Sequence, residues 1–204
     1  SIDSVLQSSF SMNLQDPKRR TQEPSYPIVS FTDIMGLRRT PNQRGWVQEH
    51  HTGYEGHEKM ISLVPLKEGD LDYNSSPTLD DRVHVLVCAI PAASVSIISD
   101  DVVKKMREVR LAASDAGIPQ LVIITKVDEA CDEVRKDIKN VYKSIYLKEQ
   151  VDKIHNLLGI PLNSIFLVKN YCSEINVNDD VSALTLCTFK LLRQMFFIVE
   201  VLRM

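Results

Sequence analysis

The chain has 204 residues and a formal net charge of −3 at pH 7, with 44% hydrophobic and 25% charged residues. These values are typical of a globular domain with enough apolar residues for a core. The small net charge gives no general electrostatic argument for binding to nucleic acid or to a membrane, and we expect neither a nucleic-acid partner nor a membrane span. Four cysteines lie far apart without a Cys-x-x-Cys pair, so we expect reduced thiols in a cytoplasmic protein. Because the sequence begins with serine, we expect it to be part of a longer chain.

The first 26 residues are predicted to form a helix and then a loop. Ile2, Val5 and Leu6 share one helical face, which predicts a helix over residues 1–10. Residues 11–26 are polar and contain two prolines, which favours a loop.

A strand is predicted over residues 27–32, and an Asp-x-x-Gly pattern, Asp33 to Gly36, follows it. A carboxylate just past a strand can reach Mg²⁺ through a water molecule, and a glycine lets a backbone N–H approach a phosphate closely. Ordinary turns also use these two residue types, so the pattern alone is unspecific. It gains weight from a second motif about ninety residues later.

Residues 37–80 are rich in glycine, proline and histidine and show no sustained hydrophobic periodicity. A connection of this length is unusual inside a compact domain. We therefore predict a single domain over residues 1–204 with a long insertion at about 37–80. His50, His51 and His57 lack the spacing of metal ligands and have no cysteine nearby, so we predict no metal site there.

The rest of the chain alternates between apolar runs and amphipathic segments. Three apolar runs predict buried strands: 83–90, 121–125 and 164–168. Four further segments predict helices: about 100–116, 130–143, 147–158 and 180–204. This order predicts an α/β fold with a mainly parallel sheet and helices on both faces. Charged residues interrupt the last helix, so we expect it to pack on the core and not to span a membrane.

The run that ends at Ile124 is followed by Thr125-Lys126-Val127-Asp128. Open α/β sheets bind ligands at this end of their strands, and the tetrapeptide matches the Asn/Thr-Lys-x-Asp pattern with which GTP-binding proteins read guanine. The carboxylate of Asp128 can accept from both N1–H and the 2-amino group of guanine, whereas adenine would leave it unpaired. Lys126 can lie along the base, and Thr125 can hold the loop. The alternative is a solvated turn in which Asp128 caps the next helix.

Several segments together resemble the interferon-induced protein 44 and 44-like family. The resemblance rests on these residues: 33–37, Gly56-His57, Ser75-Ser76-Pro77, Arg82-Val83-His84, 125–128 and Asn170-Tyr171-Cys172-Ser173-Glu174. It implies a cytoplasmic, interferon-induced, antiviral immune-response protein with a P-loop GTPase-like domain that binds GTP or GDP with Mg²⁺.

The resemblance also assigns roles to single residues. Asp33 would face Mg²⁺ through water and Gly36 the phosphates. Thr125, Lys126, Asp128 and Asn170 would bind guanine, and a backbone N–H within residues 169–173 would bond its 6-oxo group.

The phosphate end departs from the family pattern. No Gly-x-x-x-x-Gly-Lys-Ser/Thr occurs in the 204 residues, and by the resemblance this loop and its strand would precede Ser1. We therefore expect a GTPase-like fold that is incomplete at its N-terminus. The strand would lie between residues 28–32 and 83–90, so these two segments should pair directly or be left apart.

Three functions are compatible with the sequence. The first is a guanine-nucleotide-binding domain, with GTP hydrolysis by the intact protein left open. The second is a GTPase-like scaffold that binds unknown protein partners without nucleotide turnover. The third is an unrelated α/β enzyme, but the chain contains no Gly-x-Ser-x-Gly signature that would support it.

We predict that the 204-residue chain alone binds GTP weakly or not at all and has no measurable turnover, so no nucleotide is expected on it. Each charge-assisted hydrogen bond to phosphate contributes about 1.5–3 kcal/mol, so the loss of three removes roughly 5–9 kcal/mol. This corresponds to about four to six powers of ten in affinity. Titration with a fluorescent GTP analogue measures it, and micromolar or tighter binding would contradict the prediction.

Overall fold

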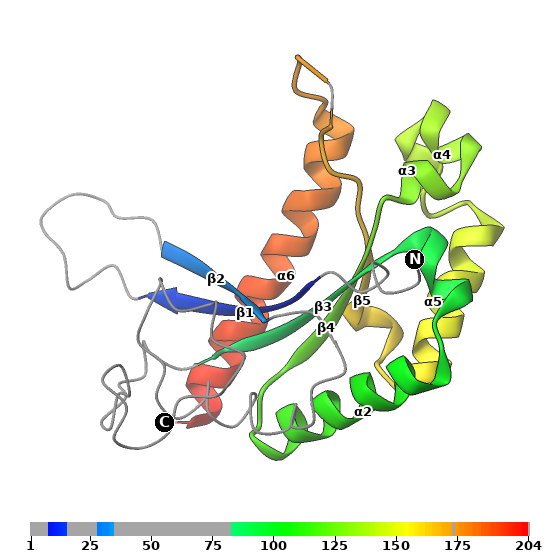
Figure 1. Ribbon diagram of the computed structural model, residues 1–204. Coiled ribbons are helices and arrows are strands. Elements are labelled where there is room, and N and C mark those ends of the chain that lie inside the picture. Colours follow the sequence, from blue (N-terminus) through cyan, green and yellow to red (C-terminus); the bar gives the residue numbers. More distant parts are fainter. Residues whose placement is uncertain (1–7, 16–27, 35–82, 173, 204) are drawn as a thin grey trace, which may run out of the picture.

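The computed structural model describes residues 8–15, 28–34, 83–172 and 174–203. These residues form a five-stranded sheet of order β2-β1-β3-β4-β5, with helices packed against it (Figure 1). The strands are β1 (Ser8–Gln15), β2 (Ile28–Ile34), β3 (Val85–Pro91), β4 (Gln120–Thr125) and β5 (Ile165–Leu167). The predicted strands over 27–32, 83–90, 121–125 and 164–168 are therefore confirmed.

Strands β3, β4 and β5 form the parallel half of the sheet. Val87 lies opposite Leu121 in the β3–β4 pair, and Val122 lies opposite Ile165 in the β4–β5 pair. The prediction of a parallel sheet is correct for these three strands. The whole sheet is mixed, because β1 runs antiparallel to both of its neighbours.

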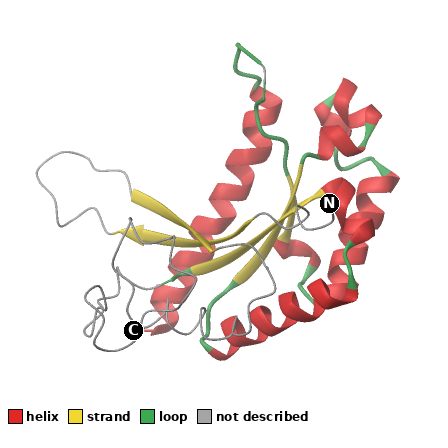
Figure 2. Cartoon of the chain, in the orientation of Figure 1, coloured by secondary structure: helices red, strands yellow, loops and turns green. Residues whose placement is uncertain are grey.

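The helices lie on both faces of the sheet, as predicted (Figure 2). The long helices are α2 (Asp100–Asp115) and α5 (Ile145–Leu158) on one face and α6 (Asp179–Arg203) on the other (Figure 1). The short ones are α3 (Val127–Ala130), α4 (Asp132–Lys136) and the 3-10 turns η4 (Ala92–Ile97), η5 (Ile138–Asn140) and η6 (Leu162–Ser164). The single helix predicted over 130–143 is wrong, because extended backbone at Cys131 and Asp137 divides it.

Alternating side chains of β4 enter two separate cores. Val122 and Ile124 of β4 pack with Leu147 and Ile154 of α5 in one core. Leu121 packs with side chains of β3 and β5 and with α6 in the other: Val85, Val87, Phe166 and Leu192. Because both faces of β4 are covered, its four central positions, 121–124, are all apolar.

The N-terminal prediction is wrong. Residues 8–15 form β1, where the sequence analysis expected the end of a helix and the start of a loop. Polar and apolar residues alternate through Phe10, Met12 and Leu14, and this period of two is typical of a strand. Strand β1 lies between β2 and β3 and pairs with both, so residues 28–34 and 85–91 neither pair directly nor stand apart. Pairing on both sides provides hydrogen-bond partners for backbone N–H and C=O groups that would otherwise be unpaired.

The long final helix was predicted to pack on the core, and α6 does so through Leu192. No helix in the described part of the chain is long and apolar enough to cross a membrane. Residues 37–80 lie outside the described residues, so the predicted insertion stays a prediction.

We predict that Leu192→Ala lowers the free energy of unfolding by about 2–5 kcal/mol, because Leu192 is 1% exposed and its removal leaves a cavity against the sheet. The matched control is Leu186→Ala on the same helix, where the side chain is 65% exposed. That change should cost less than about 0.5 kcal/mol. Urea unfolding measures both, and equal losses would show that α6 does not depend on this contact.

Candidate functional site

The carboxyl end of β4 and the segment after β5 lie side by side. Strand β4 ends at Thr125, and α3 begins two residues later. The N–H of Val168 donates to the carbonyl of Ile124 over 2.9 Å, which continues the pairing of the two strands to their ends. This contact brings residues 125–128 next to the loop that starts at Lys169.

Lys126 makes a sharp turn between β4 and α3. Its φ is 55° and its ψ is 39°, and it is the one non-glycine residue with positive φ among the residues that the structure describes. This left-handed conformation costs a lysine about 1–2 kcal/mol. Val127, which follows, is fully buried, and the carbonyl of Lys126 accepts from the N–H of Glu129 over 3.1 Å. Strain of this kind concentrates at functional sites.

Arg135 of α4 fixes the far side of this turn. Its Nε donates to the carbonyl of Asp128 and its Nη2 to the carbonyl of Glu129, both over 3.1 Å. Its other terminal nitrogen lies 2.8 Å from a carboxylate oxygen of Asp132. The sequence does not predict this role, since a lone arginine on a charged helix gives no sign that its side chain binds backbone carbonyls.

The carboxylate of Asp128 is turned toward the loop after β5. Asp128 is the second residue of α3, and Lys126 occupies the N-cap position, so the alternative that Asp128 caps a helix is wrong. Its side chain is 20% exposed, and Oδ2 lies 3.8 Å from Nζ of Lys169. A partly buried carboxylate beside an ammonium at this edge is suited to accept hydrogen bonds from a ligand.

Lys169 lies between two carboxylates. Its side chain is 19% exposed, and its ammonium donates to Oε1 of Glu174 while facing Asp128. The hydrogen bond to Glu174 is the main reason that the pKa of Lys169 is raised, and the charges of Glu174 and Asp128 add to it against the opposing effect of burial. Lys169 therefore stays protonated throughout the neutral range. The sequence analysis used this residue only to mark the start of a loop.

The loop after β5 satisfies part of its own backbone. Oδ1 of Asn170 accepts from the N–H of Tyr171 over 2.9 Å, and Oε2 of Glu174 accepts from the N–H of Cys172 over 2.8 Å. The exposed side chain of Asn170 thus stabilises the loop itself, and its predicted contact with guanine stays a prediction.

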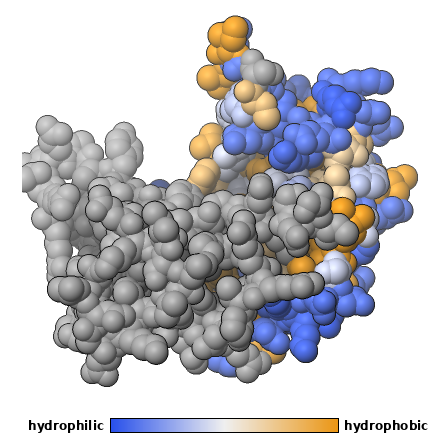
Figure 3. All heavy atoms as spheres, viewed as in Figure 1, coloured by the Kyte–Doolittle hydropathy of each residue, from blue (hydrophilic) through white to orange (hydrophobic). Residues whose placement is uncertain are grey.

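Tyr171 anchors the loop to α6. Its hydroxyl donates to the carbonyl of Asn178 over 2.7 Å and accepts from the N–H of the same residue over 2.8 Å. Beyond this anchor the chain projects outward, and Ile175 and Val177 are 99% and 79% exposed. Figure 3 shows this apolar tip above a largely hydrophilic surface over α3 and α4.

Asp33 is distant from Asp128. It lies within β2 rather than past its end, because β1 pairs it with Phe10. Phe10 also lies opposite Val87, which lies opposite Leu121, so Asp33 is level with the second residue of β4, far from the carboxyl end of that strand. At about 4.8 Å per strand, three strand spacings separate it from β4 by roughly 14 Å.

In the described structure, the residues predicted to bind phosphate and metal are therefore not brought next to those predicted to bind guanine. Gly36, like the three histidines of the insertion, lies outside the described residues. Within the described ranges, no three His, Cys, Asp or Glu side chains are grouped so that they could hold a metal ion. The Mg²⁺ role of Asp33 and the phosphate role of Gly36 remain predictions.

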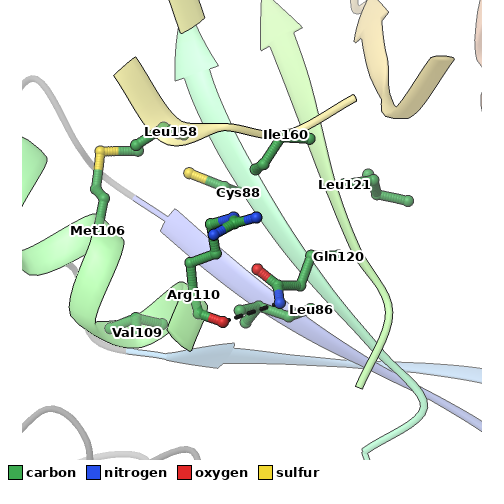
Figure 4. A pocket seen from close by; sticks show the side chains of 9 residues that line it. All are labelled: Leu86, Cys88, Met106, Val109, Arg110, Gln120, Leu121, Leu158 and Ile160. Atoms are coloured by element: carbon green, nitrogen blue, oxygen red, sulfur yellow. Dashed lines mark hydrogen bonds between the residues drawn. The ribbon is translucent and has the colours of Figure 1, made fainter. Parts of the chain in front are cut away.

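A small cavity lies under α2, away from the end of β4. Figure 4 shows its lining, which includes Cys88, Met106 and Gln120, and Nε2 of Gln120 donates to the carbonyl of Arg110 over 2.9 Å. Gln120 begins β4, whereas the predicted guanine site is at the opposite end of the strand. A volume of about 30 Å³ is too small for a purine base.

We predict that Lys126→Val destabilises the protein by about 1–2 kcal/mol, because a β-branched residue tolerates positive φ poorly. Lys126→Asn should change the free energy of unfolding by less than about 0.5 kcal/mol, since asparagine accepts this conformation. Both variants lose the exposed ion pair with Glu129, so their difference isolates the backbone. Chemical denaturation measures it, and equal stabilities would mean that the turn is not strained.

The chain is similar to several curated proteins. It is 27% identical over 117 residues to interferon-induced protein 44-like from Homo sapiens, in a match that covers 57% of this chain and 26% of that protein. It is 27% identical over 129 residues to interferon-induced protein 44 from Mus musculus, covering 63% and 31%. The Homo sapiens interferon-induced protein 44 is 26% identical over 112 residues, covering 55% and 25%.

No protein-family model and no solved structure matches the chain significantly. The matched part of the chain spans only 25% to 31% of the length of these three relatives. Over more than half of its own residues, the chain is thus homologous to the interferon-induced protein 44 and 44-like proteins, as its sequence motifs indicate.

Proposed function

We propose that this chain is a guanine-nucleotide-binding, GTPase-like domain in which Asp128 reads the base. The observation that supports this most directly is the position of the Asp128 carboxylate at the carboxyl end of β4, 20% exposed and turned toward the loop after β5. Ligands of open α/β sheets bind at this edge.

The chemistry of the carboxylate favours guanine over adenine. Two carboxylate oxygens can accept from N1–H and from the 2-amino group, in a pairing that is bidentate and charge-assisted. Adenine has no matching pair of donors, and a desolvated carboxylate left unpaired costs about 1–3 kcal/mol or more. Asp128 therefore supplies base selectivity as well as affinity.

The turn at Lys126 supports the same function. Lys126 has a left-handed backbone conformation, which glycine would adopt without strain. Unlike glycine, lysine provides a side chain that can lie along the base. The two hydrogen bonds from Arg135 hold the following backbone in place. A carboxylate on a rigid support loses little entropy when it binds a ligand.

The wider role comes from the relatives. Their names describe interferon-induced proteins, and we propose the same induction for this protein, with an antiviral role in the cytoplasm. We propose GTP or GDP with Mg²⁺ as the ligand of the intact protein, with Thr125 and Asn170 near the base. Asp33 would act on the metal and Gly36 on the phosphates.

An interaction module without nucleotide turnover is the second candidate. It is favoured by the exposed apolar tip formed by Ile175 and Val177, which directly follows Glu174, the partner of Lys169. Such a module would bind its partner equally well with and without guanine nucleotide. Partner binding that depends on the nucleotide would favour the first candidate.

We predict that Asp128→Ala weakens GTP binding by about 2–4 kcal/mol in the protein expressed from its complete coding sequence. Asp128→Asn should shift the preference from GTP toward xanthosine triphosphate, whose 2-oxo group replaces the 2-amino group. Calorimetry with both nucleotides measures the ratio of the two affinities.

The control is Asp115→Asn, which neutralises an exposed carboxylate at the end of α2. It should leave the ratio unchanged. If Asp128→Asn also leaves the ratio at the wild-type value, Asp128 does not read the base and the proposed function loses its main support.

A further inference from the structure

The ammonium of Lys169 lies beside Asp128 in the proposed site, but the function proposed above gives it no role. Nζ is 3.8 Å from Oδ2 of Asp128 and is hydrogen-bonded to Glu174. The Lys169 and Asp128 side chains are 19% and 20% exposed, so both charged groups are partly desolvated but still reach the protein surface. A ligand that reaches Asp128 also meets this ammonium.

Two N–H groups of the same loop are already engaged. The N–H of Tyr171 donates to the side chain of Asn170, and the N–H of Cys172 donates to Glu174. The sequence analysis expected a backbone N–H of this loop to bond the 6-oxo group of guanine. These two groups could do so only after breaking their present hydrogen bonds. The ammonium of Lys169 has three donors, and its hydrogen bond to Glu174 uses one of them.

The pairing edge of guanine carries three groups in a row. The 2-amino group and N1–H are donors, and the 6-oxo group next to N1 is an acceptor. Asp128 offers two acceptor oxygens, and Lys169 offers a donor beside one of them. The 6-oxo oxygen is bonded to the ring carbon next to N1, so protein groups that bind N1–H and the 6-oxo oxygen must lie a few ångströms apart. The distance of 3.8 Å between Nζ of Lys169 and Oδ2 of Asp128 meets this requirement.

We propose that Lys169 is a specificity-determining residue that donates to the 6-oxo group of guanine, while Asp128 accepts from the other two positions. This inference rests on the proposed function and assigns the third contact of its base site. Glu174 acts as a positioning residue, because its hydrogen bond holds the ammonium beside Asp128. Adenine carries an amino group at position 6, so its donor would face the donors of Lys169.

Lys169→Met tests the proposal, with GDP and 6-thio-GDP as the probes in the protein expressed from its complete coding sequence. The thio analogue keeps N1–H and the 2-amino group for Asp128 but has a much weaker acceptor at position 6. We expect wild-type protein to prefer GDP roughly tenfold, and Lys169→Met to bind GDP about tenfold to a hundredfold less tightly. The preference for GDP should fall to nearly one, and Lys169→Arg should restore it.

The matched control is Lys139→Met, which removes an ammonium paired at 3.3 Å with Asp180 and not with Asp128. It should change neither the affinity nor the preference. Calorimetry gives the affinities, and thermal unfolding shows whether each variant is folded. A residue that only supports the loop would weaken GDP and 6-thio-GDP equally, so an unchanged preference in folded Lys169→Met overturns the proposal.

The outcome also separates this inference from the proposed function. If Asp128→Asn shifts the preference between guanine and xanthine nucleotides but Lys169→Met leaves the preference for GDP over 6-thio-GDP unchanged, only the role of Lys169 is wrong. If neither variant changes any preference between bases, both proposals fail. Xanthine keeps the 6-oxo group, so the Asp128 test does not depend on Lys169.

Discussion

Strand β4 is the element on which the described structure depends. It is hydrogen-bonded to β3 on one side and to β5 on the other, and its side chains enter both cores. Val122 and Ile124 pack toward α5, and Leu121 packs toward α6, all without exposure to solvent. A strand covered in this way cannot slip by one residue without moving its apolar side chains to the wrong face. Its last residue is therefore held at one place on the sheet edge.

The proposed site follows from this fixed end. The contact between Val168 and Ile124 aligns the loop after β5 with the end of β4, and the turn at Lys126 directs the chain into α3. Asp128 and Lys169 then face each other from two segments far apart in the sequence. The relatives support homology over part of the chain, and the base-reading chemistry is our proposal from this geometry.

The sequence predicted the parallel strands well and the N-terminal part poorly. Continuous apolar runs such as 121–124 are distinctive, because a strand buried on both faces needs them. Residues 8–15 alternate in polarity over only a short stretch beside three apolar residues with helical spacing, so two periodicities competed there. The motif predicted Asp128 but not its partner, since the contact with Lys169 depends on two strands ending side by side. The role of Arg135 could not be predicted either, because its acceptors are backbone carbonyls, which every residue has.

In the proposed site, guanine is bound between the end of β4 and the loop after β5. The most direct measurement is a nuclear magnetic resonance titration of the isotope-labelled protein, expressed from its complete coding sequence, with GDP and separately with ADP. We predict that GDP shifts the backbone signals of residues 125–128 and 168–172 most strongly, and that ADP at the same concentration shifts them far less. Equal shifts with the two nucleotides, or GDP-induced shifts confined to other parts of the chain, would contradict the claim.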